Sequence, residues 1–186
     1  RLYLTLADIQ LQLGNPEAAH EVFGQISAMD NASARELSLA ADGLVELKDP
    51  QRAITCLERA LAMGGVQAAH PDAEAQKCVQ LQLYTKLAEA HTASQEHHAA
   101  LEALEEAIAI RPNNPQLEGK RASLLVELGQ LERAAAWIQA ALDHNPKDSD
   151  LNLQAARIQR SLGNLAESHR FMGKTLAAGP DSQSLD

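Results

Sequence analysis

The sequence predicts an all-α fold, a solenoid of about ten antiparallel helices arranged as helix–turn–helix repeats. Two observations predict it. Apolar residues recur with the 3.6-residue period of an amphipathic helix, and small residues recur at a fixed spacing along the chain. The clearest small column is Ala19, Ala53, Ala100, Ala134 and Ser168, with intervals of 34, 47, 34 and 34 residues.

Five further columns keep the same four intervals. A second small column is Ala7, Ala41, Ala88, Ala122 and Ala156. A bulky apolar column is Phe23, Leu57, Leu104, Ile138 and Met172. A mostly small column is Ile26, Ala60, Ala107, Ala141 and Thr175. A turn column is Gly14, Lys48, Gln95, Gly129 and Gly163, and a column that closes each unit is Asn31, Gly65, Pro112, Pro146 and Pro180.

Each unit contains two amphipathic helices joined by a tight turn. In the first unit the apolar stripe of the first helix is Leu2, Leu6, Ile9 and Leu13. Gly14-Asn15-Pro16 then ends this helix and begins the next, because glycine and asparagine tolerate a left-handed backbone and proline suits a first helical position. The second helix carries Ala19, Val22, Phe23 and Ile26 on one side. Alanines are expected where helix axes approach closely, with the bulky column filling the space beside them.

These units resemble the tetratricopeptide repeat, a helix–turn–helix unit of 34 residues with a characteristic pattern of small, aromatic and proline positions. The third unit matches at Tyr84, Leu87, Ala88, His91, Ala100, Leu104 and Pro112. The fourth matches at Ala122, Ala134, Ile138, Ala141 and Pro146, but has Glu118 where the family has an aromatic residue. Aliphatic residues replace most of the other family aromatics. The resemblance implies five tandem repeats in a right-handed superhelix whose first helices line a concave face.

We expect residues 1–186 to form a single solenoid domain, with repeats at about 1–33, 34–67, 81–114, 115–148 and 149–182. Residues 68–80 are an insertion that extends the first helix of the third repeat. Pro71 suits a first helical position, and Asp72 and Glu74 suit the positive end of a helix dipole. One helix from about Pro71 to Ala93 is therefore predicted, about 34 Å long and overhanging its neighbours. It would form an extra wall for a partner, or it is a tolerated surface insertion.

Both ends of the sequence lack a polar capping helix, which solenoids need because each repeat buries its apolar face only against its neighbours. Phe171, Met172 and Leu176 are expected to face water in part. We therefore expect the chain to be a piece of a longer protein, or its ends to stack on another molecule.

Composition argues against several classes of partner. Asp and Glu number 25 against 16 Lys and Arg, for a net charge of −9, so no surface for nucleic-acid phosphates is expected. The aromatic residues are too few for a base-stacking platform. The apolar run from Ala134 to Ile138 is far shorter than the roughly 20 residues of a membrane span, so no membrane insertion is expected. Two cysteines do not form a disulfide scaffold. A reducing, cytoplasmic location is favoured, with the bacterial periplasm as the alternative.

Catalytic and metal-binding motifs are not found. The sequence has no glycine-rich phosphate loop, no His-Glu-x-x-His and no Cys-x-x-Cys. His91, His97 and His98 come nearest to a metal site, but His91 occupies the family's tyrosine column and is expected to pack. Cys56 is expected in the core, Cys78 on the surface, and Trp137 between repeats. We therefore predict no enzymatic activity, no metal and no cofactor.

The exposed residues of the first helices are the candidate partner-binding site. One column, Asp8, Asp42, Glu89, Ser123 and Arg157, changes from acidic to basic along the chain. Neighbouring columns add the cations Lys86, Lys120 and Arg160 and the apolar residues Leu4, Leu11, Leu39, Val45, Val126 and Leu153. Mixed charge with aliphatic patches suits an extended peptide or a helix, oriented by the charge gradient. Ordinary solubilising charges are the alternative interpretation.

The resemblance implies a protein–protein interaction scaffold that binds a peptide or helix of a partner in this groove. The alternative is a structural element that assembles with copies of itself through its ends or the long helix. Some members of the family bind the C-terminal carboxylate of chaperones with a clamp of lysine and asparagine. Asp8 and Asp42 would repel that carboxylate, so this subtype is not expected.

Overall fold

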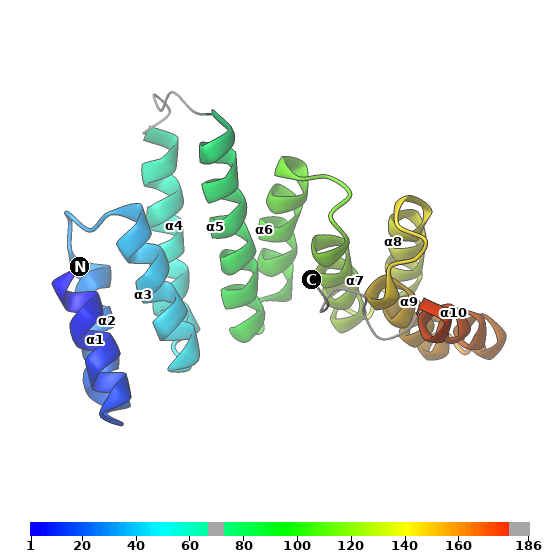
Figure 1. The fold of residues 1–186 in the computed structure, drawn as a ribbon, viewed down its shortest axis with the longest axis horizontal. Coiled ribbons are helices and arrows are strands. Elements are labelled where there is room, and N and C mark those ends of the chain that lie inside the picture. Colours follow the sequence, from blue (N-terminus) through cyan, green and yellow to red (C-terminus); the bar gives the residue numbers. More distant parts are fainter. Residues whose placement is uncertain (67–72, 179–186) are drawn as a thin grey trace. The chain divides into compact units, whose positions relative to one another are not determined.

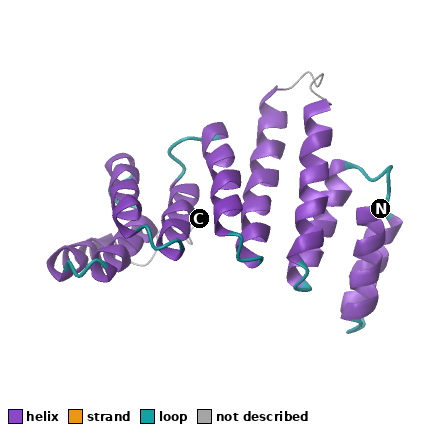
Figure 2. Cartoon of the chain, turned by 180° about the vertical axis from the view of Figure 1, so that it is seen from behind, coloured by secondary structure: helices purple, strands orange, loops and turns teal. Residues whose placement is uncertain are grey.

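The computed structural model describes residues 1–66 and 73–178, and every regular element in these ranges is an α-helix (Figure 1). No strand occurs in this part of the chain (Figure 2). The ten helices are α1 (Leu2–Gln12), α2 (Pro16–Ala28), α3 (Ala34–Glu46), α4 (Pro50–Val66), α5 (Ala73–Ala93), α6 (His97–Ile110), α7 (Pro115–Glu127), α8 (Leu131–His144), α9 (Ser149–Ser161) and α10 (Leu165–Ala178). The predicted all-α fold and its helical hairpins are confirmed.

The helices group into two compact units. The first, Arg1–Ile110, contains α1 to α6, and the second, Arg111–Asp186, contains α7 to α10. In both units each odd-numbered helix pairs with the even-numbered helix that follows it, and the even-numbered helix of one repeat packs on the odd-numbered helix of the next. A single solenoid over residues 1–186 remains a prediction.

The turn column supplies the left-handed residue that ends each first helix. Gly14, Lys48, Gln95, Gly129 and Gly163 all have φ between 62° and 81°. In each turn the following residue donates its backbone N–H to a carbonyl five residues earlier, as Asn15 does to Gln10 at 2.9 Å. This is the Schellman closure of a helix C-terminus. Lys48 and Gln95 adopt the same conformation without glycine, at a cost of about 1 kcal/mol each.

The small columns lie where helices approach most closely. Ala19, Ala53, Ala100 and Ala134 are completely buried, as are Leu57 and Leu104 of the bulky column. α2 and α3 approach each other closely where Phe23 lies against Gly43. A Cβ atom at position 43 would be 2.3 Å from Cζ of Phe23, so glycine is required there by space.

Polar contacts join consecutive repeats at the turns. Nε2 of His20 on α2 lies 2.8 Å from Oδ2 of Asp49, in the turn before α4. Gln51 on α4 donates to Oε1 of Glu96 at 2.7 Å, in the turn before α6. The hydrogen bonds from Gln51 and from His91 lower the pKa of Glu96 below its usual value. An acidic residue in the turn therefore receives a hydrogen bond from the preceding repeat at both joints of the first unit.

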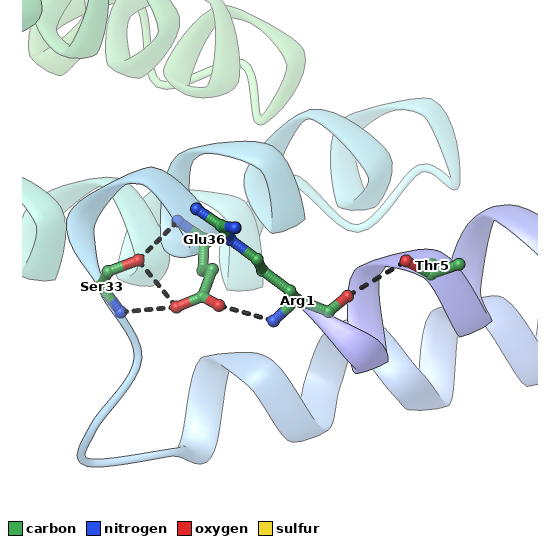
Figure 3. A network of polar contacts seen from close by, with 4 residues as sticks. All are labelled: Arg1, Thr5, Ser33 and Glu36. Atoms are coloured by element: carbon green, nitrogen blue, oxygen red, sulfur yellow. Dashed lines mark hydrogen bonds and ion pairs between the residues drawn. The ribbon is translucent and has the colours of Figure 1, made fainter.

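The N-terminus of α3 is closed by a capping box. The Glu36 backbone N–H donates to the Ser33 hydroxyl at 3.3 Å, and the Ser33 N–H donates to the Glu36 carboxylate at 3.0 Å (Figure 3). The other carboxylate oxygen of Glu36 accepts a hydrogen bond from the backbone nitrogen of Arg1 at 2.6 Å. The hydrogen bonds from this nitrogen and from Ser33 lower the pKa of Glu36 below its usual value. The start of α1 is thereby joined to the start of α3.

The extra residues of the third repeat lengthen two helices rather than one. α5 begins at Ala73 and has 21 residues, close to the predicted long helix, whereas Pro71 and Asp72 lie outside the described residues. α4 has 17 residues and runs through Gly65 to Val66, so Gly65 does not close the second repeat as the column predicted. α4 and α5 extend together past their neighbours (Figure 1). The prediction that the long helix overhangs its neighbours needs correction for α4, which packs beside α5 and is also lengthened.

Two predictions about the chain's ends need correction. Phe171 is buried, not exposed to water, while Met172 and Leu176 are exposed as predicted. On α1 the apolar stripe of Leu2, Leu6, Ile9 and Leu13 is exposed, and only Ala7 of this helix is fully buried. The side of α1 that packs on the rest of the first unit therefore carries the small residue Ala7.

We predict that Gly43→Ala destabilises the protein by about 1–3 kcal/mol, because the new methyl group overlaps the Phe23 ring. Gly173→Ala on α10 is the matched control, since a Cβ there meets no atom within 4 Å. The control should leave stability unchanged or raise it by roughly 0.5–1 kcal/mol. Urea unfolding followed by far-UV circular dichroism measures both changes. Equal midpoints for Gly43→Ala and the parent would show that the contact between α2 and α3 is not close.

Candidate functional site

The first helices of consecutive repeats lie next to one another within each unit. α1 contacts α3 and α3 contacts α5 in the first unit, and α7 contacts α9 in the second. Each first helix also contacts the second helix of its own repeat. Because the candidate groove residues all lie on first helices, each unit carries its own set of them.

In the first unit, four candidate residues surround one hollow. The hollow has a volume of about 340 Å³ and lies between α3, α4 and α5. Its candidate residues are Asp42, Val45, Lys86 and Glu89, and the other lining residues are Ala41, Glu46 and Leu57. We call these seven residues the α3–α5 hollow.

An ion pair crosses the α3–α5 hollow. Nζ of Lys86 on α5 lies 2.7 Å from Oδ2 of Asp42 on α3 and donates to the Ser38 hydroxyl at 2.9 Å. Both charged side chains remain partly exposed to solvent. Glu46 and Glu89 add two more carboxylates to the lining, so the hollow carries a net negative charge. Its walls attract a cationic group, and its floor at Leu57 and Val45 is apolar.

The other candidates of the first unit lie away from this hollow. Leu4 is half-buried and lines a second hollow, of about 420 Å³, together with Ile26 of α2 and Met29, which directly follows α2. Asp8 is exposed and Leu11 is half-buried on α1, and Leu39 is exposed on α3. None of these four residues lines the α3–α5 hollow.

In the second unit the candidates are predominantly basic. Ser123, Arg157 and Arg160 are exposed, while Lys120, Val126 and Leu153 are half-buried. α7 provides Lys120, Ser123 and Val126, and α9 provides the other three. The two contacting helices therefore present three cations and no candidate acid.

Sequence reasoning missed Glu46 and Leu57 as lining residues of the α3–α5 hollow. Glu46 directly follows Val45 at the end of α3. The available sequence signal was a charged residue beside a predicted groove residue, in a helix that buries Leu44. Leu57 belongs to the bulky column of a second helix, which was assigned to the core alone. It is buried, yet it also forms part of the floor of the hollow.

The histidine cluster does not form a metal site. His91 is buried, and its Nδ1 lies 2.7 Å from Oε2 of Glu96, so it packs as expected. Within residues 1–66 and 73–178, no three side chains of His, Cys, Asp or Glu lie close enough together to hold a metal ion.

The cysteines lie where the sequence predicted them. Cys56 is buried and Cys78 is exposed. Burial raises the pKa of the Cys56 thiol to about 11, so it stays protonated in the core. Lys77, the basic neighbour of Cys78, is paired with Glu74 at 2.9 Å.

Trp137 packs within its own repeat rather than between repeats. The guanidinium of Arg121 on α7 lies 3.6 Å from the centre of its ring, and its Nε1 donates to the Glu118 carboxylate. This hydrogen bond explains how the buried Glu118 replaces the aromatic residue of the repeat pattern. Through these two contacts Trp137 links α8 to α7.

A family model for the tetratricopeptide repeat matches residues 87–181, just over half of the chain. The chain belongs to the tetratricopeptide repeat family. No curated protein sequence matches it. The family is generally non-catalytic, and its members bind other proteins or peptides. This tetratricopeptide repeat protein is accordingly a helical-repeat scaffold for protein–protein interaction.

Solved structures of other tetratricopeptide repeat proteins share the fold. MamA from Desulfovibrio magneticus RS-1 superposes with a TM-score of 0.70 at 17% identity, covering 98% of this chain and 96% of that chain. YrrB, described as a protein with an unusual peptide-binding site, superposes with a TM-score of 0.63 at 18% identity, covering 97% and 86%. In the described part of the chain, none of the helices is both long and apolar enough to cross a bilayer.

We predict that the charged rim of the α3–α5 hollow contributes little to stability, whereas its floor contributes much. Lys86→Met removes only a partly exposed ion pair and should change the free energy of unfolding by less than about 1 kcal/mol. Leu57→Ala leaves a cavity under the same hollow and should cost about 2–5 kcal/mol. Urea unfolding of both variants tests this difference. A loss for Lys86→Met as large as that for Leu57→Ala would make the ion pair part of the structural core.

Proposed function

We propose that this protein is a non-catalytic scaffold that binds a peptide or helix of a partner protein along its first helices, with the α3–α5 hollow as the main contact. The observation that supports this is that four of the residues predicted from the sequence, Asp42, Val45, Lys86 and Glu89, surround one hollow. A peptide-binding site has been described for YrrB, and a peptide ligand is what we propose here.

The lining of the hollow indicates the chemistry of its ligand. Asp42 is neutralised in part by Lys86 at 2.7 Å, and Glu46 and Glu89 leave the hollow acidic. Val45 and the neighbouring exposed Leu39 offer apolar contact beside these charges. A partner segment with a lysine or arginine flanked by aliphatic side chains fits this combination, because its charge meets carboxylates and its flanks bury apolar surface.

The second unit favours the opposite charge. Its candidates Lys120, Arg157 and Arg160 present cations on α7 and α9. A partner segment that contacts this unit would carry aspartate or glutamate. The two sets of candidates would thus select partner segments of opposite charge, which is how charge patterns commonly provide specificity.

A random-peptide display library, selected on the immobilised protein, tests the proposal. The selected peptides should contain a lysine or arginine next to aliphatic residues. Their affinity, measured by isothermal titration calorimetry, should fall at least about fivefold with Glu46→Lys or Glu89→Lys, which is roughly 1 kcal/mol for each reversed charge.

Glu102→Lys is the matched control, because Glu102 is exposed on α6 and does not line the hollow. It should change the affinity of the selected peptides by less than about twofold. Val45→Asn supplies a second test that does not depend on attraction between opposite charges, because it removes apolar contact without adding a charge. Peptides that bind all three hollow variants as tightly as the parent would contradict the proposal.

A further inference from the structure

A lysine of the chain itself lies on the acidic side of the α3–α5 hollow. Lys86 reaches from α5 to α3, where its Nζ lies 2.7 Å from Oδ2 of Asp42 and donates to the Ser38 hydroxyl at 2.9 Å. The side chain of Lys86 is 30% exposed and that of Asp42 is 44% exposed. Because an ion pair that is so accessible to solvent contributes little to stability, another cation can take the place of Lys86.

The stacking of repeats does not require this ion pair. In the other two pairs of first helices that contact each other, the positions equivalent to Asp42 and Lys86 hold no acid with a cation. They are Asp8 with Leu39 in α1 and α3, and Ser123 with Gln154 in α7 and α9. These helices contact each other without an ion pair at this place, so the pair of Asp42 and Lys86 is a particular feature of the α3–α5 hollow.

A second carboxylate stands beside Asp42. Glu46 follows it by four residues on α3, and both residues line the hollow. Side chains at this spacing are neighbours on one helix face, and two like charges there repel each other. Lys86 pairs with Asp42, whereas Glu46 forms no ion pair within the described ranges 1–66 and 73–178. The ammonium of Lys86 therefore neutralises only one of the two neighbouring carboxylates.

We infer that the α3–α5 hollow is a subsite for an arginine side chain of the partner segment, and that Lys86 competes with this arginine for Asp42. The inference rests on the proposed function and deepens it, because it selects arginine over lysine. A guanidinium has five N–H donors in a planar fork and can bond to Asp42 and Glu46 together. The aliphatic part of the arginine would lie over the apolar floor at Val45 and Leu57.

Competition by Lys86 makes the subsite selective. A lysine of the partner would only exchange one ammonium for another at Asp42, whereas an arginine gains hydrogen bonds that Lys86 does not make. Lys86 also has a second position available, because Ser38 lies one helical turn before Asp42 and outside the lining of the hollow. The flexible stem of Lys86 lets it keep the bond to Ser38 when it leaves Asp42. Lys86 thus weakens the binding of every cation and excludes lysine most strongly.

A short peptide of sequence Leu-Arg-Leu, acetylated and amidated at its ends, tests the inference by NMR titration of the ¹⁵N-labelled protein. It should shift the amide signals of α3 and α5 around the hollow. It should bind at least about threefold more tightly than Leu-Lys-Leu, and the neutral peptide with citrulline should not bind. Lys86→Met should raise the affinity for the arginine peptide roughly three- to fivefold, because the competing ammonium is gone. Glu46→Gln should bring the affinities for arginine and lysine close together, since one carboxylate remains.

Arg35→Met is the matched control, because it removes an exposed cation from α3 that does not line the hollow. Arg35 precedes Asp42 by seven residues, about 10 Å along the helix. This is more than the Debye length of about 8 Å at 0.15 M salt, so the affinity should change by less than about 1.5-fold. Circular dichroism should show that all variants are folded.

Two results would overturn the inference. One is an arginine peptide that leaves the amides of α3 and α5 unshifted in both the parent and Lys86→Met. The other is binding to Lys86→Met that is no tighter than binding to the parent. Peptides from the display library that bind the hollow equally well with lysine in place of arginine would refute the arginine subsite and leave the proposed function standing. A display selection that yields no peptide, together with the expected titration, would refute the proposed function and leave the subsite standing.

Discussion

The structure depends on one constraint: each repeat can bury its apolar residues only against its neighbours. A single hairpin such as α3 with α4 has too little interior to enclose Leu37, Leu44 and Leu57, and contacts with α2 and α5 complete their burial. The small columns make this possible, because alanine and glycine let adjacent helices approach closely. Stability in such an array is approximately a sum of repeat and nearest-neighbour terms.

The same constraint separates residues that hold the fold from residues that remain available for binding. Columns that face a neighbouring helix are apolar, whereas the α3–α5 hollow carries Asp42, Glu46, Lys86 and Glu89 at its rim. Stacking requires none of these charges. Leu2 on α1 and Leu176 on α10 are exposed, whereas Leu83, Leu151 and Leu142 in the same columns are buried.

Much of the fold followed from periodicity, because stacking imposes residue size at fixed intervals. The turn column placed Lys48 and Gln95 at the position of the glycines, and the structure shows that both are left-handed. Periodicity could not show that α4 lengthens together with α5, since the columns locate the extra residues between two repeats without dividing them between the flanking helices. It also identified the stripe on α1 without showing that nothing in the described chain covers it. In the hollow, Asp42 and Lys86 form an ion pair although they belong to different sequence columns. Leu57 is both a core residue and part of the floor of the hollow, and its column indicated only the core role.

Hydrogen–deuterium exchange of the native protein, resolved by helix, tests most directly whether neighbour contacts set stability. At the lowest workable protein concentration, the amides of α3 and α4, which have repeats on both sides, should exchange most slowly in the first unit, and those of α1 most rapidly. In the second unit, α9 should exchange more slowly than α10. Equal protection of α1 and α4 under these conditions would contradict the account, because stability would then be shared by the whole unit rather than built from neighbours.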